Sequence, residues 1–300
     1  MRFAFWPKPH TDFASLLEIC LHAEQTGWDR IYFADHFMPS GANTVVPTLE
    51  AWTTLAALGA RVPRVELATL VTGNTYRHPA VLAKMAANLD QITGGRAVLG
   101  LGSGWQENEH RAYGIEYFDI PTRIDRLGEA CELIRSLFSQ EKTSFAGKHY
   151  QCEDAPLDPK PVRDKLPILV GGGGAKKTLR IVARFADEWN IWGDPEELSE
   201  KGAVLARHCD AVGRDPAEIS HSAVALLFMT DDPDQAAKLR GGVAGRPTLA
   251  GNPDQISETI EQYRKAGVHE IVVPDFTLGE GAARRDVLDR FIEEVAPRFR

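Results

Sequence analysis

The sequence has few of the features that mark secreted, metal-binding or nucleic-acid-binding proteins. Its four cysteines are widely separated with no CxxC pair, a pattern typical of isolated thiols in a reducing compartment rather than of disulfides or a zinc site. No HxH or HExxH motif occurs, so a metallohydrolase is disfavoured and no metal site is expected. The formal net charge is −8 and no basic run exceeds two residues, which argues against nucleic acid and favours a small-molecule partner.

Long apolar runs are also missing. No stretch approaches the ~20 apolar residues that a membrane span requires. The first ten residues, MRFAFWPKPH, lack the apolar core of a secretory signal. We therefore expect a cytoplasmic protein with no membrane partner.

The sequence does contain a repeated alternation of short apolar runs and segments with helical periodicity. Repeated strand–helix units predict a parallel sheet, and eight of them favour a closed (β/α)8 TIM barrel, in the α/β class, over an open sheet. No linker divides the chain, so we expect a single domain over 1–300. The eight runs are RFAFW, RIYFA, VELATLV, RAVLGLG, PILVGG, EWNIW, SHSAVALLFM and EIVVPDF.

Helices are expected between these runs. In 79–93 the apolar residues fall on one face, with Pro79 in the first turn and Gly94 at the C-terminal cap. Residues 139–166 break the alternation with their prolines and charges, and we interpret them as an insertion or a lid, with a short hairpin in SFAGKHYQCED. The other helices are expected at 12–26, 48–60, 106–113, 122–138, 175–185, 196–212, 253–267 and 283–296.

Two glycine groups follow predicted strands, where a barrel of this type carries its site. GLGSG has GxGxG rather than GxGxxG spacing, and LVGGGGAKKT has a lysine where a Walker loop needs its last glycine, so neither nucleotide motif is met. A glycine-rich turn before a helix can instead bind an anion through free N–H groups, with Lys176, Lys177 and Thr178 adding contacts. The loop is therefore either a phosphate site or a set of tight turns without a ligand.

Asp35 and His36 follow the second strand and form the one acid–histidine pair among the strand ends. A lone histidine there is either a structural hydrogen-bonding group or a proton carrier, and its ordinary pKa near 6.5 suits proton transfer. The position beside Asp35 at a strand end favours catalysis. Three other groups have two interpretations each: Trp105 and Trp192 line the pocket or belong to the core, and the Arg77–His78 pair contacts a cofactor or is structural.

Several stretches together resemble one family. YFADHF, TYRHPA, GGRAVLGLGSGW and PILVGGGG occur in the order found in the luciferase-like flavin and deazaflavin enzymes, most closely in the branch that uses coenzyme F420. The likeness covers nearly the whole chain. It implies an oxidoreductase that transfers a hydride between F420 and a small organic substrate, and often a homodimer. The alternatives are an FMN-dependent monooxygenase and a non-catalytic flavin-binding barrel.

The resemblance also implies roles by position. It places a non-prolyl cis peptide behind the cofactor ring, expected here at Thr69–Leu70, and puts Asp35 and His36 at the reactive ring edge. Ser40 and Trp105 stand where the sugar-phosphate dehydrogenases of this branch have a tryptophan and a glutamate, which argues against glucose 6-phosphate as the substrate. The remaining cofactor contacts are expected from Gly102, Gly104, Gly171, Gly172, Gly173, Gly174, Lys176 and Thr178.

Overall fold

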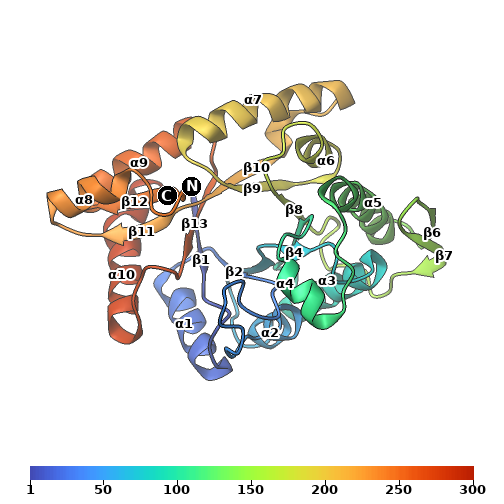
Figure 1. The fold of residues 1–300 in the computed structure, drawn as a ribbon, viewed down its shortest axis with the longest axis horizontal. Helices are drawn as coiled ribbons and strands as arrows, with labels where there is room; N and C mark the ends of the chain where they lie inside the picture. The colour runs from blue at the N-terminus through green and yellow to red at the C-terminus, as the bar shows by residue number, and fades with distance from the viewer.

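Eight parallel strands pair in a closed ring in the computed structural model, which describes residues 1–300 (Figure 1). The pairing of β3 with β5 closes the ring, and the two-residue β4 (Thr72–Gly73) extends the contact along β5. The predicted TIM barrel is therefore confirmed. In chain order the eight strands are β1 (Arg2–Trp6), β2 (Arg30–Phe33), β3 (Glu66–Thr69), β5 (Ala97–Gly102), β8 (Ile168–Gly171), β9 (Glu188–Trp192), β10 (Ser220–Val224) and β13 (Glu270–Pro274).

Helices surround this barrel. α3 (Pro79–Thr93) has the predicted bounds, and Gly94 ends it in the left-handed conformation that glycine adopts without strain. No helix is both long enough and apolar enough to cross a membrane. The other helices are α1 (Phe13–Thr26), α2 (Ala51–Gly59), α4 (Glu107–Tyr113), α5 (Ile120–Ser139), α6 (Thr178–Phe185), α7 (Pro195–Val212), α9 (Pro253–Lys265) and α10 (Gly281–Glu294), with 3-10 turns at Pro216–Glu218 and Ala296–Arg298.

The segment after β10 differs from the prediction of one strand and one helix. The run SHSAVALLFM divides at Ala225, and its second half forms β11 (Leu226–Met229). β11 pairs in parallel with β12 (Thr248–Gly251), and α8 (Pro233–Arg240) connects them. Sequence reasoning missed α8 and β12 because α8 buries a single residue, Ala236, and so has no apolar stripe.

The predicted insertion holds the predicted hairpin. β6 (Lys142–Ala146) and β7 (Gln151–Pro156) pair antiparallel and extend from the side of the barrel near α5 (Figure 1). Glu129 of α5 accepts hydrogen bonds from three successive main-chain N–H groups, those of residues 148–150. The hairpin turn is therefore fixed to the barrel wall by one carboxylate.

The strands are buried on both faces, as expected for parallel strands enclosed by helices. Along β1, Phe3 and Phe5 belong to the large core between barrel and helices, whereas Ala4 and Trp6 belong to a smaller cluster of ten residues within the barrel. This alternation follows the two-residue period of a strand. The carboxyl ends of the strands are consequently positioned by a rigid frame.

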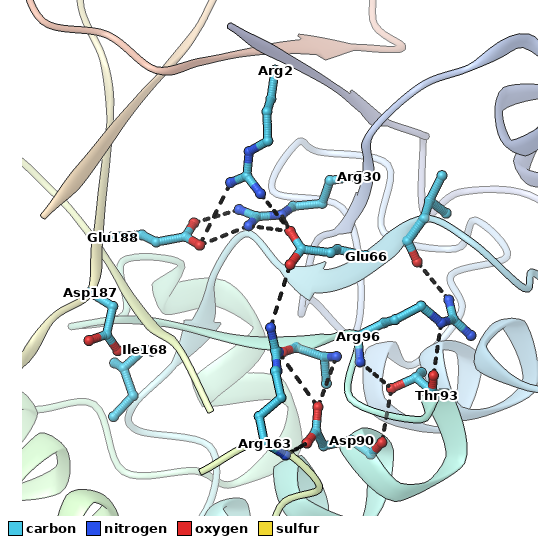
Figure 2. A network of polar contacts seen from close by, with 12 residues as sticks. Arg2, Arg30, Glu66, Asp90, Thr93, Arg96, Arg163, Ile168, Asp187 and Glu188 are labelled. Carbon is cyan, nitrogen blue, oxygen red and sulfur yellow. Dashed lines mark hydrogen bonds and ion pairs between the residues drawn. The ribbon is translucent and has the colours of Figure 1, made fainter. Parts of the chain in front are cut away.

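The amino ends of the strands are filled by ion pairs instead of apolar side chains. Arg30 of β2 is fully buried and contacts the carboxylates of Glu66, Glu188 and Glu270, at 2.6, 2.5 and 3.3 Å. Arg2 contacts the same three carboxylates from the first residue of β1, and Figure 2 shows both arginines between Glu66 and Glu188. Burial raises the pKa of Glu270 although both arginines oppose the shift.

We expect Gly100→Ala to destabilise the barrel by about 3 kcal/mol, at the upper end of ordinary overpacking. A Cβ atom at Gly100 would lie 1.9 Å from the carbonyl oxygen of Thr69, and the Thr69 hydroxyl bonds both main-chain groups of Gly100. The nearest atoms are main-chain atoms of Thr69 in the neighbouring strand, which cannot move aside as the end of a flexible side chain could. Urea unfolding followed by circular dichroism measures the change. Gly41→Ala is the control, because its Cβ meets nothing within 4 Å, and equal stability of the two variants would contradict the packing argument.

Candidate active site

A cavity of about 970 Å³ opens at the carboxyl ends of the barrel strands. Its lining comes mainly from the segments after β1, β2, β3, β5, β8, β9 and β13 and includes His36, Leu70, Gly104 and Gly171–Gly173. The volume is at the upper end of ligand pockets and is enough for a large planar cofactor with a small substrate beside it. The predicted position of the site at the strand ends agrees with this cavity.

One wall of the cavity carries the non-prolyl cis peptide, one residue later than expected. The cis bond joins Leu70 to Val71 rather than Thr69 to Leu70, and both Leu70 and Val71 line the cavity. Thr69 is instead buried, is the last residue of β3, and bonds Gly100. The N–H of Leu70 still donates to Phe33 in the regular parallel ladder, so the irregular bond begins only after that contact.

Two predicted glycines make room for this wall. A Cβ atom at Gly102 would lie 2.6 Å from Val71, and one at Gly171 would lie 3.0 Å from the same side chain. Gly171 lines the cavity, whereas Gly102 lies behind Val71 and does not. Gly104 lines the cavity with a positive φ of 79°. These glycines allow two strands to approach an apolar wall at the base of the cavity.

The glycine-rich loop presents free main-chain donors. The N–H of Gly172 donates to the Asn190 carbonyl, but those of residues 173–177 have no acceptor in the protein. They precede the first turn of α6, whose dipole adds positive potential. Consecutive free N–H groups in such a turn suit an anion, and the loop is therefore chemically fit to hold a phosphate group.

The side chains around this loop differ from the expected set. Lys177 pairs with Asp125 at 2.6 Å, and Lys176 and Thr178 do not line the cavity. Gly174 lies against the Thr178 hydroxyl, also away from the cavity lining. The cavity-lining cation that contacts the loop comes from α7, where Lys201 Nζ donates to the carbonyl of Gly173 at 3.0 Å. Lys201 sits on a helix after the next strand, so no sequence motif linked it to the glycines.

His36 lines the cavity and is held from behind by a buried carboxylate. Its Nδ1 lies 2.7 Å from Glu109 of α4, and its Nε2 has no partner in the protein. Glu109 is fully buried and also accepts from the N–H of Phe37 at 2.7 Å and from the Tyr76 hydroxyl. Burial alone would raise the pKa of Glu109, but these hydrogen bonds and the charge of His36 hold it below the usual range.

Asp35 is not beside the cavity, in contrast to the prediction. Its side chain is fully buried and accepts two hydrogen bonds from Arg77, at 2.6 and 3.2 Å. Arg77 also contacts Glu50 at 2.7 Å. Burial raises the pKa of Asp35 against the opposing effect of Arg77. Successive residues of an extended chain point to opposite sides, so His36 faces the cavity while Asp35 anchors the loop.

Sequence reasoning missed Glu109 and Tyr76. Glu109 is the last of four charged or amide side chains in QENE and stands five residues after Gly104, so nothing in the local sequence distinguishes it from the other three. The pairing becomes visible only when α4 folds over the loop after β2. Neither Arg77 nor His78 lines the cavity: Arg77 binds Asp35, and His78 Nδ1 accepts from the N–H of Ala80 at the start of α3.

Aromatic and cationic side chains form the mouth of the cavity. Trp105 is 62% exposed and meets the His36 ring edge-on, and Trp192 also lines the cavity, so neither tryptophan is a core residue. The guanidinium of Arg246 lies 4.6 Å from the ring centroid of Trp192. Lys8 and Lys201 are further cations of the lining, and Glu197 lies 3.4 Å from Lys201.

The profile of the family described as "luciferase-like monooxygenase" matches residues 1–244. The chain belongs to this family. An F420-dependent glucose-6-phosphate dehydrogenase of Microbacterium testaceum is 36% identical, over 95% of this chain and 93% of its own length.

Two solved structures share the fold. An F420-dependent secondary alcohol dehydrogenase, solved with an F420–acetone adduct, superposes with a TM-score of 0.86 at 20% identity, covering 100% of this chain and 99% of its own. The coenzyme F420-dependent tetrahydromethanopterin reductase of Methanopyrus kandleri gives 0.84 at 19% identity, with the same coverage. At 19–20% identity, this similarity shows that the fold is shared and no more.

Proposed function

We propose that this luciferase-like protein is a coenzyme F420-dependent oxidoreductase that transfers a hydride between the deazaflavin and a small organic substrate. The observation that carries the proposal is one cavity that brings together an apolar wall, Gly173 at the start of a loop of free N–H groups, and a histidine with a free Nε2. The F420-dependent relative at 36% identity supports the choice of deazaflavin. Isolated thiols, all free in the structure, support action in the cytoplasm, and a homodimer stays a prediction.

The bound deazaflavin would supply the hydride chemistry, and the protein would supply position and a proton site. Residues 173–177 would hold the phosphate group through their N–H groups, with Lys201 adding positive charge. Leu70 and Val71 would support one face of the ring system and exclude water from it. His36 would give a proton to, or take one from, the substrate oxygen through Nε2.

We expect the apo-protein to bind oxidised F420 tightly and FMN at least tenfold more weakly. Equilibrium titrations at moderate salt, followed by cofactor fluorescence, measure both constants. Tight FMN binding with weak F420 binding would move the protein to the FMN-dependent monooxygenases, where reduced flavin and oxygen should support turnover. Absence of binding by either cofactor would contradict the phosphate-loop assignment.

A charge placed in the loop tests the anion site directly. Gly173→Asp puts a carboxylate beside the free N–H groups, and we expect it to weaken F420 binding at least tenfold, about 1.4 kcal/mol. The new Cβ meets only the flexible end of Lys201, at 3.1 Å. Ala217→Asp adds the same charge at an exposed position near the amino ends of the strands. Equal affinities in the two variants would argue that the phosphate lies elsewhere.

The substrate is best sought among small alcohols, carbonyl compounds and sugar phosphates. The relative at 36% identity is named for glucose 6-phosphate, and Lys8, Lys201 and Arg246 give this cavity positive charge. Trp105, which stands where the sugar-phosphate dehydrogenases of this branch have a glutamate, argues for a less polar substrate. Reduction of F420 by glucose 6-phosphate, measured against secondary alcohols, therefore decides between the two classes.

A further inference from the structure

Glu109 is a fully buried carboxylate that does not line the cavity, and three protein groups contact its oxygens. Glu109 nevertheless contacts His36, which does line the cavity. We propose that Glu109 is a positioning residue that fixes the Nδ1–H tautomer of His36 and so leaves Nε2 free for proton transfer with the substrate. This inference rests on the proposed function in one respect only, the use to which Nε2 is put.

The hydrogen bonds around Glu109 determine whether His36 Nδ1 donates a proton to the carboxylate or accepts one from it. One carboxylate oxygen accepts from the Phe37 N–H, which can only donate, and the other accepts from the Tyr76 hydroxyl and faces His36 Nδ1. The pKa of Glu109 is held below its usual range, because burial is outweighed by these contacts. An ionised carboxylate only accepts hydrogen bonds. His36 must therefore carry its proton on Nδ1.

The surroundings of His36 supply no competing anion. Across the cavity it faces His10, whose pKa is lowered first by burial and second by the charge of His36. The Trp105 ring meets it edge-on, and the Asp35 carboxylate is occupied by Arg77. Glu109 is therefore the one anion in contact with the imidazole, and it both orients the ring and stabilises the imidazolium that forms when Nε2 takes a proton.

Glu109→Gln tests the tautomer with little change of shape. The glutamine oxygen must accept from the Phe37 N–H, which places the amide NH₂ against His36 Nδ1. Because an amide NH₂ only donates, Nδ1 must become an acceptor, and the proton moves to Nε2. NMR of protein with ¹⁵N-labelled histidine, assigned by comparison with His36→Gln, reads the tautomer in the apo-protein. We expect Nδ1–H in the wild type and Nε2–H in Glu109→Gln.

Turnover gives the second readout. We expect kcat of Glu109→Gln to fall by at least tenfold while the F420 affinity stays within twofold, because Glu109 does not line the cavity. The acid limb of the pH profile of kcat/KM should move to lower pH, since the imidazolium has lost its counter-charge. Glu109→Asp, which keeps the charge, should restore the wild-type position of that limb.

The control is Glu129→Gln, another carboxylate that accepts three hydrogen bonds but lies outside the cavity lining. It should leave the His36 tautomer and kcat unchanged. An Nε2–H tautomer in the wild-type protein would overturn the proposal without any variant, even if Glu109→Gln failed to fold. Retention of Nδ1–H and of kcat within twofold in Glu109→Gln would also overturn it. The tautomer is read without cofactor, so failure of the F420 assignment would not obscure either result.

Discussion

His36→Ala is expected to lower kcat/KM by about 10²- to 10⁴-fold, the range typical of losing a general acid–base group. His36 is the one histidine of the cavity with a ring nitrogen held by a buried carboxylate and the other nitrogen free. Removing the imidazole leaves the loop of residues 173–177 and the Leu70–Val71 wall unchanged. The F420 dissociation constant should therefore stay within threefold, and stopped-flow absorbance of F420 in single turnovers should show the loss in the chemical step.

Two further measurements separate this effect from a general disturbance of the fold. Added imidazole should restore part of the rate in His36→Ala, because the deletion leaves space in the cavity. His22→Ala is the matched control: His22 also pairs with a carboxylate, that of Asp289 at 2.6 Å, but on the outer face where α1 meets α10. Unchanged turnover in His36→Ala with the substrate found by screening would contradict the proton-transfer role.

Features encoded within one stretch of the chain were predictable from the sequence, whereas features that depend on packing between distant segments were not. The barrel was predictable because each strand–helix unit carries its own periodicity, as in α3. Eight such units in succession favour a parallel sheet that closes into a barrel. The glycine loop was predictable because Gly171 to Gly174 lie together in the chain. The additional β11–α8–β12 unit was not predictable, because α8 buries only Ala236 and therefore has no periodic apolar face in its sequence.

The site itself was only partly predictable for the same reason. His36 stands at a strand end and was found, but its partner Glu109 is separated from it by 73 residues. Asp35 was expected to face the site beside His36, but its side chain lies on the opposite side of the chain and binds Arg77. Two adjacent residues of an extended segment point to opposite sides. Lys201 and Tyr76 likewise reach their positions only through the packing of separate strand–helix units.

The second large effect concerns the opposite end of the barrel. Arg30→Met should destabilise the protein by about 3–5 kcal/mol at pH 7, the usual cost of removing one partner from a buried ion pair. Arg30 is fully buried, and its loss leaves Glu66, Glu188 and Glu270 with the partly exposed Arg2 as the one arginine in contact with all three and with Arg163 in contact with Glu66 at 3.5 Å. Equilibrium urea unfolding, with the same m-value for both proteins, measures the difference.

The pH dependence of this difference identifies charge as its cause. In the wild type the pKa of Glu66 is lowered, because Arg30 and Arg2 outweigh burial, so its stabilising contribution is present near neutral pH and is lost as pH falls. Without Arg30 the folded-state pKa values of Glu66 and Glu270 rise, which makes that folded state bind protons more readily than the unfolded chain, so its stability increases as pH falls. The difference in free energy of unfolding between the wild type and Arg30→Met should therefore become smaller as pH falls from 7 to 5.

Arg285→Met distinguishes this network from an ordinary ion pair. Arg285 contacts Glu18 at 2.5 Å, but the two side chains are 37% and 67% exposed, and an exposed pair contributes at most about 1 kcal/mol. A loss of several kcal/mol in Arg30→Met alone, reduced when Glu270→Gln removes one carboxylate as well, would show that charge balance holds the amino ends of the strands together. A loss that stays constant from pH 7 to pH 5 would instead mean that Arg30 acts through the volume it fills.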